Sequence, residues 1–337
     1  MLAGMRAIVA ERYGSPEVLQ VVEREEPECS QDDLLIEVRA TSVTTAEWRI
    51  RAGDFGTGFS WLGRIMFGLT GPRQTTTGRE FAGRVLGVGA AVTNFAAGDD
   101  VFGVHPGANA ERIAMPASGV VTRMPAGLTH AQAVSLPFGG LCAIDFLEDK
   151  AKVQAGERVL IVGASGGVGA YLVQVAVSLG ADVTAVCSAD NAAFVRELGA
   201  SSVVDYRVTE LETLPGPYDV IVDTVGKTSV RSFRPMLSQA GRHVFIEGGA
   251  WELVQSLTSG LRRGPRVVGG TTEDSRDGLE RLRARVEAGA IQPVFVHRYP
   301  MDQVVEAHRL VESRHRRGAV VLDFPASGVD PAFMPHE

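Results

Sequence analysis

A short glycine-rich stretch, "VLIVGASGGVGAYLVQVAVSLG", constrains the fold more than any other part of this 337-residue sequence. The apolar residues 159–162 that open it are too few for a helix, so they predict a strand buried on both faces. After the glycines, apolar residues recur at helical spacing as far as Gly180, which stands where a helix C-cap glycine is expected. A second apolar run, residues 183–187, predicts another buried strand. Together these segments predict a β-α-β unit.

The turn between the first strand and the helix matches a G-x-G-x-x-G fingerprint, with Ala164, Gly166 and Gly169 at its three positions. The first position allows a tight turn, the second the close approach of a pyrophosphate, and the third helix-on-strand packing. Free N–H groups at the helix start and the helix dipole suit a diphosphate. The pattern predicts a dinucleotide site, and a glycine turn without a ligand is the alternative. The predicted site comprises Ala164, Ser165, Gly166, Gly167, Val168 and Gly169.

Charge and cysteine usage exclude several classes of protein. The formal net charge of −7 argues against a nucleic-acid surface. No apolar run approaches the about 18 residues of a membrane span, and we see no signal peptide. The cysteines are far apart, match no C-x-x-C spacing, and are typical of small buried residues in a reducing cytoplasm. We therefore expect a cytoplasmic protein without nucleic-acid or membrane partners.

The organisation of the chain predicts an α/β protein with two domains. Residues 1–127 contain short β-prone runs between Gly, Asp and Asn turn signals, which predict a small β-barrel or irregular sandwich. Residues 128–268 alternate strands with helices, which predicts a doubly wound parallel sheet. Residues 269–337 mix both kinds of element. The nucleotide domain would thus be inserted between two parts of the other domain, with a ligand in the cleft between them.

Segments spread over nearly the whole chain resemble the medium-chain dehydrogenase/reductases. Within that family the chain is most similar to the zinc-independent quinone oxidoreductase branch, which includes zeta-crystallin-like and enone-reducing proteins. The matching segments include "YGSPEVLQVVEREEP", "GREFAGRVLGVGAAVTNFAAGDDVFG", "GASGGVG", "VCSADNAAFVRELGASSVVDY" and "EAGAIQPVFVHRYPMDQVVEAHRLVESRHRRGAVVL". The resemblance implies a GroES-like β-barrel catalytic domain around a Rossmann nucleotide-binding domain.

The resemblance also implies the absence of zinc. Thr44, Arg79 and Phe138 stand where zinc-dependent relatives have Cys, His and Cys, and none of them ligates zinc in that way. The cysteine cluster of a structural zinc site is missing after "DDVFG". Without a Lewis acid, a localised alkoxide is poorly stabilised, whereas reduction of an enone or a quinone spreads charge over an enolate or hydroquinone. We therefore expect no metal and a flat, apolar, unsaturated carbonyl or quinone substrate.

Four residues are candidates for the reaction site. Thr44 stands where relatives carry Asn beside the nicotinamide, so its hydroxyl is the catalytic candidate, and bonding to its own backbone is the alternative. Glu47 fits a buried-acid position, for which we favour a structural ion pair with a neighbouring arginine. Phe138 and Cys142 match positions near the nicotinamide in relatives, and an inert buried thiol is the alternative for Cys142. Ala319 replaces a lysine that is usual in the family.

The end of the second strand predicts NADPH rather than NADH. NAD-specific Rossmann domains usually place a carboxylate there, which would repel a 2′-phosphate, whereas this strand ends "VCSADN". Ser188 can donate a hydrogen bond to the phosphate, and Tyr206 matches a position that contacts it in relatives, with Arg207 nearby. Asp190 is a contrary sign. Gly248, after the run "GRHVFIEGG", completes the predicted cofactor-binding residues.

Two features concern assembly and access. Residues 54–77 are rich in aromatic and apolar residues. They predict a hydrophobic lid over the substrate, and the alternative is core packing or an oligomer contact. In relatives the strand near "GRHVFIEGG" lies at a sheet edge, where pairing across a two-fold axis is favoured, so we expect a homodimer.

The preferred interpretation is NADPH-dependent reduction of a quinone or of the conjugated C=C bond of an enone or enal. One alternative is a biosynthetic enoyl-thioester reductase, in which the cluster "LRRGPR" (Arg262, Arg263 and Arg266) contacts carrier phosphates. Another is an NADPH-binding structural or regulatory protein with little turnover.

Overall fold

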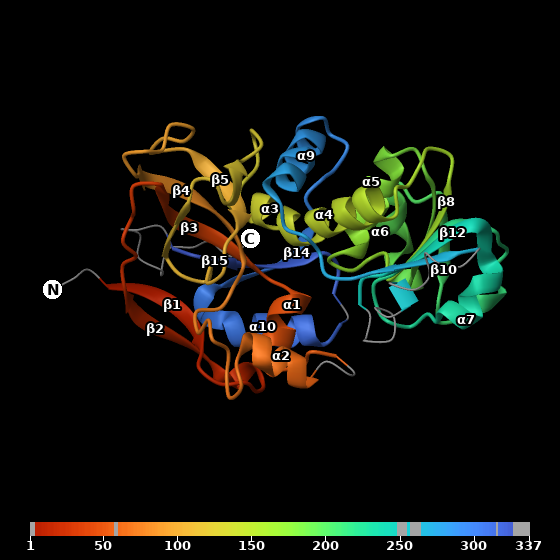
Figure 1. Ribbon diagram of the computed structural model, residues 1–337, viewed down its shortest axis with the longest axis horizontal. Helices are drawn as coiled ribbons and strands as arrows, with labels where there is room; N and C mark the ends of the chain where they lie inside the picture. The colour runs from red at the N-terminus through yellow and green to blue at the C-terminus, as the bar shows by residue number, and fades with distance from the viewer. Residues whose placement is uncertain (1–3, 57–59, 248–254, 257–263, 315, 326–337) are drawn as a thin grey trace.

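The computed structural model describes the whole chain except residues 1–3, 57–59, 248–254, 257–263, 315 and 326–337 (Figure 1). The described strands form a six-stranded sheet, a seven-stranded sheet and a two-stranded ribbon. In Figure 1 the two large sheets lie at opposite ends of the molecule, with several helices between them. We call the unit around the six-stranded sheet the central domain and the rest the flanking domain.

The central sheet is parallel throughout and has the order β10-β9-β8-β11-β12-β13. In chain order this is 3-2-1-4-5-6, which is the doubly wound arrangement expected. Its switch point lies between β8 and β11, where successive crossovers leave in opposite directions. The strands are β8 (Arg158–Val162), β9 (Asp182–Cys187), β10 (Ser202–Asp205), β11 (Tyr218–Asp223), β12 (Leu237–Phe245) and β13 (Arg266–Gly269).

Apolar residues on alternate positions of β8 cover both faces of the central sheet. Val159 and Ile161 face the cluster that contains α5 (Gly169–Ser178) and α4 (Leu136–Ile144), whereas Leu160 packs with Phe233 of α7 (Val230–Phe233) on the other face. This two-residue period explains why the strand is apolar along its length. The short helix α6 (Ala192–Glu197) follows β9.

Tyr171 of α5 connects the central domain to the segments that precede α4 and β14 (Phe295–Pro300). Its ring is fully buried, and its hydroxyl lies 3.2 Å from Ser135 Oγ just before α4. The same hydroxyl accepts the N–H of Val294, which precedes β14, at 2.9 Å. A Cβ on Gly139 would lie 2.3 Å from the Tyr171 ring, so α4 and α5 pack at a distance that only glycine allows there.

The flanking domain draws its seven-stranded sheet from both ends of the chain. The last strand, β15, pairs antiparallel with β3, with Val320 opposite Val43. The boundaries at residues 127 and 268 stay predictions. The remaining strands of this sheet are β3 (Asp33–Val43), β4 (Glu80–Val88), β5 (Asp100–Val104), β6 (Arg112–Pro116), β7 (Val120–Arg123), β14 and β15 (Ala319–Asp323); β1 (Gly4–Ala10) and β2 (Leu19–Glu25) form the ribbon.

Helices α3 (His130–Val134) and α9 (Arg276–Glu287) lie with α4 between the two sheets (Figure 1). On another side, α10 (Val304–Glu312) packs against α1 (Thr45–Ala52) and β15. Helix α2 (Ser60–Phe67) follows α1 along the chain. Phe67 of α2 stacks on Phe55, while its outer face exposes Trp61 and Met66 to 67% and 61%. Within residues 54–77, the apolar side chains of this outer face therefore point to solvent, and the choice between a lid and an oligomer contact stays open.

The expected position of the dimer-forming edge is wrong. The strand of "GRHVFIEGG" is β12, and β13 pairs with it along its outer side. This further strand is short and contains the apolar pair Val267 and Val268. The pair follows the arginine-rich run "LRRGPR", so the sequence offers little indication of a strand there. In the described part of the sheet the edges are β10 and β13.

Glu80 at the start of β4 is a buried acid in the flanking domain, and it predicts a pH effect on stability. Its side chain accepts a hydrogen bond from Ser42 Oγ at 3.0 Å, and burial raises its pKa to about 7 from 4.5. Because the pKa in the folded state exceeds the unfolded value, the folded protein loses stability as the pH rises through this range. We predict that Glu80→Gln removes this loss, so that at pH 8 the variant is about 3 kcal/mol more stable than the wild type.

Urea denaturation at pH 5 and pH 8 measures this effect. At pH 5 the difference should shrink to less than about 1 kcal/mol, because Glu80 is then protonated in the folded protein and only the unfolded chain has begun to lose this proton. Glu23→Gln, on the exposed face of β2, serves as the matched control and should leave the pH dependence unchanged. An equal stability difference between Glu80→Gln and the wild type at both pH values would contradict the prediction.

Candidate cofactor site

A large cleft opens at the carboxyl ends of the central strands. It has a volume of about 1120 Å³, beyond the roughly 300–1,000 Å³ of drug-sized sites. The cleft is lined by residues at or just after the carboxyl ends of β8, β9, β10, β11 and β12. It therefore spans the switch point between β8 and β11. Ligands of open α/β sheets bind at this location. The cleft thus lies where the sequence predicts a dinucleotide.

The glycine turn after β8 has the steric properties that the fingerprint predicts. Gly163 has a φ of +84°, and a Cβ there would lie 2.3 Å from the Thr224 hydroxyl. A Cβ on Gly169 would lie 2.1 Å from the carbonyl oxygen of Gly163, so α5 can begin this close to β8 only with glycine. At Gly166 the nearest atom would be 3.4 Å away, which leaves that position open toward the cleft.

The predicted cofactor residues separate into those that line the cleft and those that do not. Ala164 is fully buried beneath the turn, and Cys142 lines neither the cleft nor the smaller cavity described below. Gly248 lies outside the described residues. Those that line the cleft are Ser165, Gly166, Gly167, Val168, Gly169, Ser188 and Tyr206. Their contacts with a cofactor stay predictions.

Cys142 is a thiol of low reactivity. It is buried near the C-terminal end of α4, and burial raises its pKa to about 12. The thiolate, which is the nucleophilic form, is therefore scarce at neutral pH. The placement agrees with the inert-thiol alternative and gives no support to direct contact with a cofactor.

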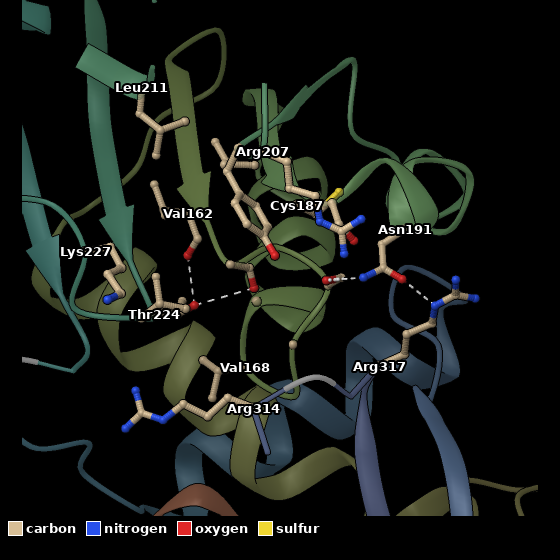
Figure 2. Close-up of a pocket in the computed structure, with 18 of the residues that line it drawn as sticks. Val162, Val168, Cys187, Asn191, Arg207, Leu211, Thr224, Lys227, Arg314 and Arg317 are labelled. Carbon is tan, nitrogen blue, oxygen red and sulfur yellow. Dashed lines mark hydrogen bonds between the residues drawn. The ribbon is translucent and has the colours of Figure 1, made fainter. Parts of the chain in front are cut away.

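One end of the cleft is basic and joins the two domains (Figure 2). Arg207, after β10, forms an ion pair with Asp190 at 3.0 Å. Arg317, from the loop before β15, donates hydrogen bonds to the Asn191 side chain and to the carbonyl oxygen of Asp190. Asn191 in turn donates to Ser165 Oγ at 3.0 Å. Sequence reasoning missed Asn191 and Arg317, because neither belongs to the fingerprint.

A compact loop after β11 shapes the opposite end, where Figure 2 shows Lys227 across the cleft from Arg317. The fully buried carboxylate of Asp223 accepts four hydrogen bonds, from the backbone N–H groups of Val225, Gly226 and Thr228 and from the Thr228 hydroxyl. These bonds fix the turn that carries Thr224 and Lys227 into the cleft wall.

A second, smaller cavity adjoins the cleft. Its volume of about 10 Å³ is close to the space that one water molecule needs. Gly167 and Arg316 border both the cavity and the cleft, and Thr44 and Phe138 come together in the cavity wall. The complete lining is Ser42, Val43, Thr44, Ser135, Phe138, Gly139, Gly167, Arg316 and Ala319. The structure therefore places the catalytic candidate beside the glycine turn.

Thr44 has a structural role as well as a place in this cavity. It is the N-cap of α1, and its hydroxyl oxygen accepts the N–H of Glu47 at 3.2 Å. N-cap residues satisfy one of the helix's unpaired N–H groups in this way. The backbone bond weighed as an alternative is therefore present, and because the oxygen acts as its acceptor, the hydroxyl proton remains available for donation into the cavity.

The expected ion pair of Glu47 with a neighbouring arginine is wrong. Glu47 is buried, and its Oε1 accepts a hydrogen bond from Asn109 Nδ2 at 2.8 Å and lies 3.6 Å from His308 Nε2. Arg49 pairs with Glu247 instead, and Arg51 pairs with Glu312 of α10. Residues two apart on a helix do not share a face, and the packing of α10 supplies Arg51 with another acid. The partners of this acid therefore come from distant segments, and its structural role stays a prediction.

The three positions that correspond to zinc ligands hold no metal-binding group. Thr44 and Phe138 line the small cavity, and Arg79 pairs with Asp274. In the described parts of the chain no group of three or more His, Cys, Asp or Glu residues could hold a metal ion. Nor do those parts include a helix that is long and apolar enough to cross a membrane.

Known proteins resemble this chain over nearly its whole length. Residues 30–126 match the alcohol dehydrogenase GroES-like domain, and residues 198–322 match a family described as zinc-binding dehydrogenase. A chloroplastic quinone-oxidoreductase homolog of Spinacia oleracea is 34% identical and covers 95% of this chain and 98% of its own. The chain belongs to the medium-chain dehydrogenase/reductase superfamily, in its zinc-independent quinone oxidoreductase branch.

Two further similar proteins extend the comparison. A chloroplastic NADPH-dependent alkenal/one oxidoreductase of Arabidopsis thaliana is 29% identical over 94% of this chain and 79% of its own. The structure of a quinone oxidoreductase from Coxiella burnetii superimposes with a TM-score of 0.83 at 28% identity and covers 96% of this chain and 100% of its own. The GroES-like and Rossmann domains expected from the sequence are therefore confirmed.

Gly166 and Gly169 of the turn should respond differently to the same substitution by alanine. Gly169→Ala forces a methyl group against the Gly163 carbonyl, and this clash outweighs the gain of up to about 1 kcal/mol that alanine brings to a helix. We predict a loss of about 1–3 kcal/mol in the free energy of unfolding. Gly166→Ala has room to fold normally but would occupy the space that the fingerprint predicts for a diphosphate, so it should weaken binding of a nicotinamide dinucleotide about tenfold or more.

Thermal denaturation and titration of NADPH fluorescence separate the two effects, and each variant is the control for the other. Normal stability of Gly169→Ala, or normal NADPH affinity of Gly166→Ala, would contradict the roles that the turn assigns to these positions.

Proposed function

We propose that this protein is an NADPH-dependent, zinc-independent oxidoreductase that reduces a quinone or the conjugated C=C bond of an enone or enal. The observation that carries the proposal is the contact between two sites. The dinucleotide cleft and the small cavity of Thr44 and Phe138 share Gly167 and Arg316 in their walls. A cofactor held on the glycine turn would therefore end next to the catalytic candidate.

The residues present fit a nicotinamide dinucleotide. Gly166 is open toward the cleft. The N-cap residue of α5 is Val168, whose side chain cannot accept a hydrogen bond from the N–H groups at the helix start. Such a helix start binds phosphate. The similar Arabidopsis and Coxiella proteins are named as an NADPH-dependent reductase and a quinone oxidoreductase. When bound, the nicotinamide supplies the hydride.

The chain's own groups favour an acceptor whose negative charge is delocalised. Ser42, Thr44 and Ser135 bring hydroxyl groups to the small cavity, and none of its described lining residues is a carboxylic acid. Ser42 donates to Glu80 and Ser135 to the Gln132 carbonyl, so the donor that remains for an acceptor is the Thr44 hydroxyl. Hydroxyl donors can support an enolate or a hydroquinone anion, whereas a localised alkoxide needs a stronger electrophile or an acid. Proton delivery would then come from solvent.

The basic end of the cleft supports the choice of NADPH. The contrary sign, Asp190, is paired with Arg207, so its charge is offset. Arg317 adds a second guanidinium beside Asn191, and both arginines line the cleft with Ser188 and Tyr206. Two guanidinium groups beside Ser188 suit a 2′-phosphate better than a ribose hydroxyl.

Arg207→Ala should weaken NADPH binding and leave NADH binding unchanged. Because the Arg207 side chain is 52% exposed and water screens its charge, we expect a modest increase in Kd for NADPH of about three- to tenfold. Arg231→Ala, which removes an exposed arginine of α7, is the matched control and should change neither Kd. Tighter binding of NADH than of NADPH by the wild type would overturn the cofactor assignment.

The proposed reaction is tested with a panel of acceptors. NADPH absorbance should fall in the presence of quinones, enals or enones, and simple alcohols should be inert with NADP⁺. Thr44→Val should lower kcat by at least about tenfold with little change in NADPH affinity, because the lost donor acts on the transition state. Thr44→Ser should keep most of the activity.

Loss of the α1 cap is a separate effect of Thr44→Val, worth about 1 kcal/mol of stability. Ser229→Ala controls for it, because it removes an N-cap from α7 and leaves the small cavity intact. Oxidation of simple alcohols without reduction of any quinone, enal or enone would refute the reaction. Binding of NADPH with no turnover of any acceptor would favour a structural or regulatory protein instead.

The remaining alternatives carry less weight. Of the cluster proposed for a carrier-bound thioester, Arg266 is an exposed residue of β13, and Arg262 and Arg263 lie outside the described residues. Reduction of enoyl thioesters in the acceptor panel would restore that alternative. We also propose that the protein is cytoplasmic and a homodimer, with pairing through β13 or β10, since a two-fold axis at an exposed parallel edge allows main-chain pairing.

A further inference from the structure

Arg316 is the charged residue in the described wall of the small cavity. It belongs to the loop between α10 and β15, and side chains and backbone of the flanking domain hold its guanidinium. Nη1 donates to the carbonyl oxygen of Val311 at 3.0 Å, and Nη2 donates to Thr45 Oγ1 at 3.2 Å. Its Nε is buried and has no hydrogen-bond partner. The group is thus fixed in place and still has an unused donor.

No acidic residue of the described chain forms an ion pair with Arg316. Arg314, two residues earlier in the same loop, differs in this respect because it pairs with Glu247. Burial lowers the pKa of Arg316 to about 10, and the group therefore remains charged at neutral pH. A half-buried cation without a counter-charge is solvated less well than one at the surface, and an anion that reaches it relieves this cost. The unpaired charge therefore points to a function that involves negative charge.

The position of Arg316 indicates where that negative charge arises. On one side it approaches the glycine turn, where a Cβ built on Gly167 would lie 3.6 Å from Nη2. On the other side it borders the small cavity together with Thr44 and Ala319. A cavity of about 10 Å³ suits one oxygen atom rather than a whole substrate ring.

We propose that Arg316, together with the Thr44 hydroxyl, binds the oxygen of the acceptor and stabilises the negative charge that this oxygen gains during reduction. The proposal rests on the proposed function. NADPH would give a hydride to the acceptor and become NADP⁺, and the negative charge would appear on the acceptor oxygen. A solvent proton would then complete the reduction, at the α-carbon of an enolate or at the oxygen of a hydroquinone anion. Fixed donors around a developing oxyanion are the arrangement that lowers such barriers most. Ala319, with its short side chain, leaves the cavity open to the guanidinium.

A competing role for Arg316 is to hold the cofactor diphosphate at Gly167. The two roles differ in what a substitution changes. A residue that holds the diphosphate sets the affinity for NADPH, whereas a residue that stabilises the acceptor oxyanion changes kcat and the ionisation of a bound acceptor analogue.

Titration of bound 4-nitrophenol measures the field at this cavity directly, with no turnover. The phenolate absorbs visible light and the phenol does not, and its oxygen stands in for the acceptor oxyanion. With the protein and NADP⁺ in excess, the wild type should lower the pKa of the bound phenol by about one to three units, as a nearby cation does. Arg316→Met should abolish most of this shift, and Arg316→Lys should retain part of it.

Matched controls and kinetics complete the experiment. Arg309→Met removes an arginine from the exposed side of α10, where it pairs with Glu17, and should leave the titration unchanged. Arg316→Met should also lower kcat about a hundredfold or more, with the Kd for NADPH within about threefold of the wild type. Melting curves of both arginine variants verify that they fold.

Two results would overturn the proposal. One is the same titration of bound 4-nitrophenol in wild type and Arg316→Met. The other is an increase of about tenfold or more in the Kd for NADPH with kcat unchanged, which would assign Arg316 to the diphosphate. Failure of the wild type to reduce any acceptor would count against the proposed function alone, since the phenol titration does not depend on turnover.

Discussion

The close contact between the start of α5 and the end of β8 determines where every part of the site lies. Gly169 lies against the carbonyl oxygen of Gly163 so closely that a Cβ would come within 2.1 Å of it. The helix therefore begins immediately beyond the strand, and its positive end points into the cleft rather than over the sheet. Gly163 itself adopts a positive φ of +84°, which lets the chain turn back within so few residues. A longer connection would fill the space that the cleft occupies.

The flanking domain completes the site through the loop that ends at β15. The N–H of Gly318 approaches the carbonyl oxygen of Ser165 at 3.3 Å, so this loop lies directly on the glycine turn. From here Arg317 reaches the basic end of the cleft, and Arg316 reaches the small cavity. Because β15 also pairs with β3, which leads into Thr44, one strand pair fixes both walls of the cavity. The loop before β15 therefore positions residues of both the basic end of the cleft and the small cavity.

Local features of the sequence allowed the central domain and its turn to be predicted, because those features act over short distances. The β8-turn-α5-β9 unit depends on neighbouring residues, and its steric demands appear as glycines at fixed spacing. The errors concern long-range pairing. Glu47 finds Asn109 and His308 rather than a nearby arginine, and β13 covers the strand expected at the edge. Neither outcome follows from spacing, since both depend on how distant segments meet.

Arg316 shows the same limit in a functional residue. In the sequence it is one of several arginines in a basic run, and nothing local separates it from Arg314 or Arg317. The fold pairs Arg314 with Glu247 and bonds Arg317 to Asn191. Arg316 stays half-buried at the small cavity, where neutral groups, the Val311 carbonyl and the Thr45 hydroxyl, hold its guanidinium. The formal charge of −7 belongs to the whole chain, whereas the field within a small cavity depends mainly on the few charges that line it. An acidic protein can therefore still offer an electropositive position for a developing anion.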